Sequence, residues 1–249
     1  MKTSGYIIFI LLYWGTINNL SCQNNTPDDS YYFKAKDFKK SMMQDSALIY
    51  FKKASIEYEK SHKIEQFINS YNEIGIILTR QDKYEEAKTY LDKALSLGLA
   101  SLDSNNLSVA TTYISLGVVC NAEEKYEQAL VYHYKALAIR LAKLGEINPE
   151  VATSYGNIGN VYRNNKEYDQ SIDAHLKAMR IREKVFGLTS SEIVESYVGL
   201  GNAYKQKKEY NISLEYFEKA LNNKILQFGE GSKDLIRFYK YISDVYYLL

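Results

Sequence analysis

A register of 42 residues constrains the fold of this chain more than any other feature of its sequence. Residues of the same type return at this interval along most of the chain. A sequence that keeps one fixed interval of this length is built from tandem units that each form the same small structural element. The clearest members are the tyrosines Tyr71, Tyr113, Tyr155, Tyr197 and Tyr239, and the glycines Gly75, Gly117, Gly159 and Gly201.

The stretch "YGNIGNVYRNNKEYDQS" (155–171) shows what each unit contains. Its glycines, Gly156 and Gly159, do not match the G-x-G-x-x-G of a dinucleotide-binding loop, and the residues before them do not form a strand pattern. Gly159 belongs to the register, and so does the small residue Ser171. Small residues on two antiparallel helices let their backbones approach closely. We therefore predict that Gly159 packs one helix against the next and does not bind phosphate.

Composition agrees with an all-helical chain and argues against highly charged partners. The 249 residues include only two prolines, and 31 basic residues balance 30 acidic ones. A balanced charge gives no strong attraction to nucleic acid or anionic lipid, so neither is expected as a partner. With Cys22 lipidated or removed, Cys120 has no cysteine partner, and packing must hold the fold without a disulfide.

The ends of the expected helices carry capping signals. Gly145 and Gly187 are predicted to end the second helix of their repeats. Asn148, Pro149 and Glu150 supply an N-cap, a proline at the first helical position and an acid at the positive helix end. Thr189 and Glu192 have the spacing of a capping box for the next repeat.

On these residues, the units resemble tetratricopeptide repeats (TPRs) of the kinesin light chain type, which also occur widely in bacterial proteins. The segment "ALAIR…LG…NPEVATSYGNIGNVYRNNKEYDQS" carries the resemblance most clearly. It implies an all-α fold, a right-handed α-solenoid of helix-turn-helix repeats. The implied array covers 31–249: a degenerate repeat over about 31–68, repeats over 69–110, 111–152, 153–194 and 195–236, and a terminal helix over 237–249.

The first 22 residues are expected to be a signal peptide. Lys2 is their only charged residue, and the apolar run "YIIFILLYW" suits a secretory signal better than a membrane span. "LSC" resembles the end of a bacterial lipobox, which would make Cys22 a lipidation site, although Asn19 stands where leucine is usual. Ordinary signal cleavage with an unmodified Cys22 is the alternative. We expect an exported, periplasmic or cell-surface protein, with 23–30 as a flexible tether.

No residue pattern predicts catalysis, a metal or a cofactor. The three histidines include His133 and His175, which are one register apart, but these occupy the packing position held by Leu91 and Phe217 in neighbouring repeats. We interpret both as packing histidines with satisfied rings. No Cys/His cluster has the spacing of zinc ligands, so the chain is not expected to be an enzyme.

A polar stripe on the first helices is the best candidate for a binding site. The resemblance implies that these helices line a concave groove, and residues one and four positions after the packing glycine share one face. Asparagine amides can both donate to and accept from a peptide backbone, while basic side chains can bind a carboxylate. The predicted peptide-binding residues are Asn157, Asn160, Arg163, Asn202 and Lys205. The alternative is a solvated helix face without a ligand.

Two functions follow from this reading. The first is a non-catalytic scaffold that binds a protein or peptide in the groove, with a membrane reached only through lipid on Cys22. The second is the N-terminal sensor region of a longer bacterial signalling protein or CHAT-type protease. The apolar final segment "YISDVYYLL" begins another repeat in register without its second helix, which favours the second function. The alternatives are that this helix caps the array as it stands, or that a partner covers it.

Overall fold

The computed structural model describes residues 29–249, which form eleven α-helices, one short 3-10 helix and no strand. The predicted signal peptide with Cys22, and the predicted tether up to residue 28, lie outside the described residues. The helices are α2 Ser30–Lys40, α3 Gln44–Lys60, α4 Ile64–Arg80, α5 Tyr84–Ser101, α6 Leu107–Ala122, α7 Tyr126–Leu144, α8 Pro149–Asn164, α9 Tyr168–Phe186, α10 Val194–Gln206, α11 Tyr210–Phe228, η1 Lys233–Leu235 and α12 Ile236–Tyr246.

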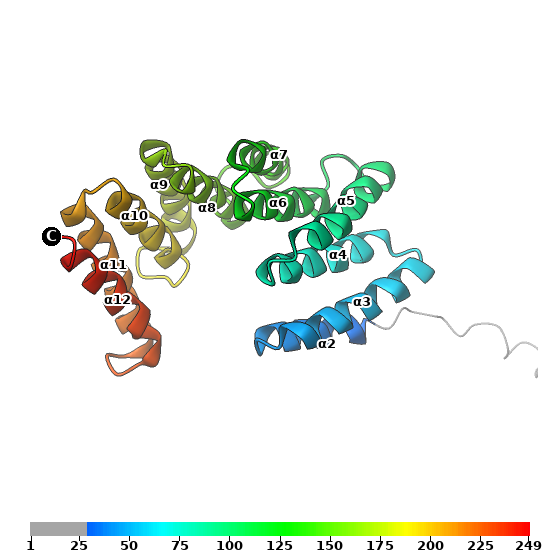
Figure 1. Cartoon of the computed structure of the whole chain (residues 1–249), viewed down its shortest axis with the longest axis horizontal. Coiled ribbons are helices and arrows are strands. Elements are labelled where there is room, and N and C mark those ends of the chain that lie inside the picture. Colours follow the sequence, from blue (N-terminus) through cyan, green and yellow to red (C-terminus); the bar gives the residue numbers. More distant parts are fainter. Residues whose placement is uncertain (1–28) are drawn as a thin grey trace, which may run out of the picture.

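The helices pair in chain order and the pairs follow one another along an arch (Figure 1). The helix pair α2–α3 forms one end of the arch, and α11 with α12 forms the other. First helices of successive repeats also contact one another, as α4 does with α6 and α8 does with α10. The predicted all-α solenoid of helix-turn-helix repeats is confirmed.

The packing glycines confirm the interpretation of the register. A Cβ atom on Gly159 would lie 2.8 Å from the ring of His175, and one on Gly201 would lie 2.6 Å from the ring of Phe217. Gly117 has the same relationship to His133. Real Cβ atoms do not approach other atoms this closely, so these positions require glycine for the two helices of a repeat to pack.

Each tight turn inside a repeat uses a left-handed residue that is not glycine. Asp82, Glu124, Lys166 and Lys208 have φ between 59° and 68°. The residue after each donates its N–H across the end of the first helix, as Lys125 does to the Cys120 carbonyl oxygen at 2.8 Å. This six-residue closure is a Schellman motif, and it turns the chain directly into the second helix.

The longer connections between repeats bear out most of the capping predictions. Gly145 and Gly187 end α7 and α9 with φ of 78° and 85°. The Asn148 side chain accepts a hydrogen bond from the Glu150 N–H at 2.8 Å, and Pro149 is the first residue of α8. The capping box predicted from Thr189 is wrong, because α10 begins only at Val194 and its N-cap side chain makes no capping bond.

Buried arginines on the second helices connect consecutive repeats. Arg140 donates to the Glu150 carbonyl oxygen at 2.8 Å and to the Ser154 hydroxyl at 3.0 Å. One register later, Arg182 donates to the Ser196 hydroxyl at 2.6 Å. Each arginine therefore ties its helix to the first helix of the following repeat and contributes to the packing that fixes the angle between the two repeats.

Candidate functional site

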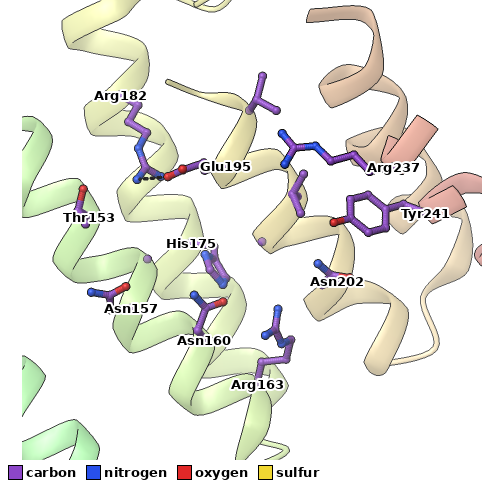
Figure 2. Close-up of a pocket in the computed structure, with 14 residues that line it drawn as sticks. Thr153, Asn157, Asn160, Arg163, His175, Arg182, Glu195, Asn202, Arg237 and Tyr241 are labelled. Carbon is purple, nitrogen blue, oxygen red and sulfur yellow. Dashed lines mark hydrogen bonds and ion pairs between the residues drawn. The ribbon is translucent and has the colours of Figure 1, made fainter. Parts of the chain in front are cut away.

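A pocket of about 320 Å³ opens between α8, α9, α10 and α12, near the C-terminal end of the array (Figure 2). Helix α8 supplies a row of side chains one turn apart, α9 supplies the floor, and α12 supplies the far wall. The lining residues are Thr153, Gly156, Asn157, Asn160, Arg163, His175, Arg182, Val194, Glu195, Val198, Gly199, Asn202, Arg237 and Tyr241.

Most of the residues proposed from the sequence meet in this pocket. Asn157, Asn160 and Arg163 lie along one face of α8, as i, i+3 and i+6 spacing requires, and Asn202 faces them from α10 (Figure 2). Lys205 is half-buried and is not among the lining residues. Within the described chain, no hydrogen bond engages the amides of Asn157, Asn160 or Asn202, so all three are free to bond a ligand.

The two arginines on α8 and α9 differ in whether a carboxylate offsets their charge. Arg182 is held by Ser196 and lies 3.3 Å from the Glu195 carboxylate. Arg163 has no carboxylate within ion-pair distance among residues 29–249, and its recorded hydrogen bond is a long one of 3.4 Å to the Asn164 side chain. Burial lowers the pKa of the Arg163 guanidinium, which nevertheless stays charged.

Helix α12 supplies a second cation that has no carboxylate partner among residues 29–249. Arg237 extends toward the pocket beside Tyr241 (Figure 2), and its guanidinium lies 4.6 Å from the ring centre of Phe238. With the charge of Arg182 offset by Glu195, Arg163 and Arg237 give the pocket an excess of positive charge. Such a site attracts a carboxylate or another acidic group.

His175 forms the buried floor of the pocket. Its side chain fills the packing position as predicted, but the expected satisfied ring is wrong, because neither Nδ1 nor Nε2 has a hydrogen-bond partner within residues 29–249. Burial, together with the nearby charges of Arg163 and Arg182, lowers the pKa of His175 to about 3. The ring is therefore neutral at physiological pH.

Sequence reasoning missed four residues that shape the pocket. Gly156 faces open space, and Gly199 lies against the His175 ring, so neither position places a side chain over the floor. Gly199 could have been found from the sequence, because it departs from the register: the equivalent position of the previous repeat holds Asn157. Arg237 and Tyr241 had none, because their approach depends on how α12 packs against the preceding helices.

The described residues contain neither a cluster of metal-ligating side chains nor a helix suited to span a membrane. Between residues 29 and 249, no group of three or more histidine, cysteine, aspartate or glutamate side chains lies together in a way that could hold a metal ion. In the same part of the chain, no helix combines the length and the apolar character that a bilayer span requires.

Comparisons with solved structures show the same fold at low sequence identity. BtubC (BKLC) from P. vanneervenii is 15% identical, with 88% of this chain and 84% of that chain covered and a TM-score of 0.65. A putative kinesin light chain from Podosopora anserina is 16% identical, with 82% and 96% covered and a TM-score of 0.63. No curated protein matches the chain.

A third structure is much longer than this chain. A signal transduction ATPase with a tetratricopeptide repeat sensor, from Pyrococcus horikoshii, is 21% identical, with 88% of this chain and 32% of that chain covered and a TM-score of 0.66. The tetratricopeptide repeat model itself matches residues 66–142 and 150–225, which together exceed half of the chain. The paired helices, the packing glycines and this match agree, and the chain belongs to the tetratricopeptide repeat family.

Proposed function

We propose that this chain is a non-catalytic scaffold that binds a peptide segment of a partner protein in the pocket between α8, α9, α10 and α12. The observation that carries the proposal is the meeting of Asn157, Asn160, Arg163 and Asn202, chosen from the sequence alone, around one pocket. Membership of a repeat family whose arrays serve as interaction scaffolds supports it.

The chemistry of the pocket indicates how a peptide binds. The free amides of Asn160 and Asn202 can each donate to a backbone carbonyl and accept from a backbone N–H, so they hold an extended chain without reading its sequence. Arg163 and Arg237 lack carboxylate partners among residues 29–249 and favour an acidic side chain in the bound segment. A volume of about 320 Å³ accommodates part of a peptide and not a folded domain.

Replacing Asn160 and Asn202 by alanine tests the proposal. Both side chains face the pocket, so we expect the double variant to lose most of its affinity for a peptide selected on the wild-type chain, with an unchanged thermal unfolding curve. Asn222→Ala is the matched control, since this amide is exposed on α11 and is not among the residues that line the pocket. Equal binding by wild type and the double variant contradicts the proposal.

A second candidate function is a sensor region within a longer signalling or proteolytic protein. The Pyrococcus horikoshii structure, in which an array of this fold is named as a sensor, supports this candidate by analogy of fold. The genomic reading frame tests it. A catalytic or ATPase domain encoded after Leu249 would support it, and a stop codon at that point would overturn it.

A further inference from the structure

His175 combines deep burial with polar atoms that nothing in the described chain satisfies. Its side chain is 3% exposed, and both ring nitrogens lack a hydrogen-bond partner there. Leaving buried polar atoms unbonded costs free energy, so native structures rarely do so without a reason. Here the ring lies at the floor of a pocket that is lined by free amides and cations (Figure 2).

Two glycine backbones pack against the ring. A Cβ atom at Gly199 would lie 2.5 Å from the ring, and one at Gly159 would lie 2.8 Å from it. Because neither of these neighbours carries a side chain, the ring is packed closely between the helices and is still one of the residues that line the pocket.

The equivalent histidine of the previous repeat has a different environment. His133 packs against Gly117 in the same way, and the satisfied ring expected for it is also wrong, because its Nδ1 has no hydrogen-bond partner within residues 29–249. Unlike His175, it is not among the residues that line the pocket. The next first helix carries Asn157 at the register position where α10 carries Gly199. The two histidines therefore share a packing role, and only His175 also has access to a candidate ligand site.

The charges that face His175 come from all the surrounding helices. Arg163 lies on α8, Arg182 on its own helix α9, Glu195 on α10, and Arg237 with Tyr241 on α12. Glu195 is largely exposed and is paired with Arg182, so the free ring meets mainly positive charge, which keeps it neutral. An acidic group placed among these residues would offset that charge and favour the imidazolium form.

We propose that His175 is the specificity-determining residue of the pocket: with Arg163 it binds the carboxylate of an acidic ligand side chain, and it takes up a proton from solvent as it does so. The inference rests on the proposed function and deepens it. The protonated ring donates a hydrogen bond from one nitrogen to the carboxylate oxygen, and no covalent bond forms or breaks. A neutral amide side chain in the ligand leaves the ring unprotonated and binds less tightly.

Proton uptake gives binding a defined pH dependence. The ring is neutral in the free protein down to about pH 3, and the bound carboxylate restores a pKa nearer the ordinary histidine value of about 6.5. Affinity for an acidic peptide should therefore rise as the pH falls below that value, by up to about tenfold per pH unit. The rise ends near pH 4.5, where the carboxylate of the ligand begins to be protonated.

The test uses a library of random heptapeptides, selected at pH 6 on the wild-type chain, on His175→Leu and on His133→Leu. Leucine suits both positions, since Leu91 packs against Gly75 in the same way. Wild type and His133→Leu should select peptides enriched in aspartate or glutamate, and His175→Leu should lose that enrichment. Calorimetry in two buffers of different ionisation enthalpy should then show uptake of about one proton per bound peptide for the first two proteins only.

His175→Gln guards against a variant that fails to fold, because glutamine keeps a hydrogen-bond donor and cannot take up a proton. It should still bind the selected acidic peptide, with no proton uptake and no rise in affinity below pH 6.5. Proton uptake that persists in His175→Gln overturns the inference. The inference is also overturned if the peptides selected on the wild-type chain lack acidic residues and yet need Asn160 for binding. That result would leave the proposed function standing. A library that yields no binder overturns both.

Discussion

The Nη1 atom of Arg182 on α9 lies 2.6 Å from the hydroxyl oxygen of Ser196 on α10, so a buried charge is bonded across the boundary between two repeats. Arg140 and Ser154 repeat this relationship one register earlier, at 3.0 Å. In a solenoid each repeat contacts only its neighbours, so stability depends on such interfaces as much as on the repeats themselves. This contact also holds the wall of the pocket, because Glu195, next to Ser196, lines it.

Ser196→Ala is expected to destabilise the array more than Ser154→Ala. Both arginines keep a carboxylate partner at Nη2. When its serine is lost, however, Nη1 of Arg140 keeps its bond to the Glu150 carbonyl oxygen, whereas Nη1 of Arg182 has no other partner among the described residues. Hydrogen bonds to buried charged groups contribute about 1.5–3 kcal/mol, so Ser196→Ala should cost an amount in this range. Urea unfolding followed by circular dichroism measures both, and an equal or larger loss for Ser154→Ala would contradict the expectation.

Replacing the two glycines that border the pocket, Gly199 and Gly156, by alanine should change the stability of the array in opposite directions. At Gly199 the added Cβ meets the His175 ring at 2.5 Å, and Gly159 blocks the ring on its other side, so we expect a loss of about 1–3 kcal/mol from overpacking. At Gly156 the Cβ meets nothing within 4 Å, so the higher helix propensity of alanine should stabilise α8 by up to about 1 kcal/mol. If both substitutions changed the free energy of unfolding in the same direction relative to wild type, this interpretation of the site would be wrong.

The periodic part of the fold could be predicted because spacing along a helix determines contacts within a repeat. The register alone assigned Gly159 and His175 to packing positions, and the ring of His175 does pack against the backbone of Gly159. The left-handed turn residues were not predicted, because Lys166 and Lys208 are not types that signal positive φ. Their conformation is imposed by closure of the helix pair rather than by their own preference.

The pocket was only half predictable, for a different reason. Asn157, Asn160 and Arg163 share one helix face, so their proximity follows from sequence spacing. Their distance to Arg237 depends on the angles accumulated between successive repeats, which are set by contacts such as that of Arg182 with Ser196. A repeat pattern does not encode those angles in any single residue, so the residues contributed by α12 could not be foreseen.

Lipidation of Cys22 stays a prediction from the sequence, and metabolic labelling can test it. Cells that express the chain with an alkyne fatty acid should yield a labelled protein, and Cys22→Ser should abolish the label. Cys120→Ser is the matched control. Cys120 is buried and burial raises the pKa of its thiol, so it is a poor site for modification, and this variant should keep the label. An unlabelled wild type would favour ordinary signal cleavage.

The two buried histidines should make the array less stable in mild acid. Burial lowers the pKa of His133 to about 4 and that of His175 to about 3, whereas both have a pKa near 6.5 in the unfolded chain. Below pH 6.5 the unfolded chain therefore binds more protons than the folded one. The free energy of unfolding is greatest above that pH and falls as the pH drops toward 4, by at most about 1.4 kcal/mol per pH unit for each histidine.

Leucine at either position should flatten this dependence, because it removes one titrating group while filling the packing position. Carboxylates also titrate in the lower part of the window, so the informative quantity is the difference in slope between each variant and wild type from pH 4.5 to 6.5. Phe217→Leu is the control. Phe217 packs against Gly201 at the equivalent position of the next repeat and does not titrate, so its replacement should leave the slope unchanged. Parallel profiles for wild type and His175→Leu would mean that this ring is protonated in the folded chain, and would remove the basis for proton uptake at the pocket.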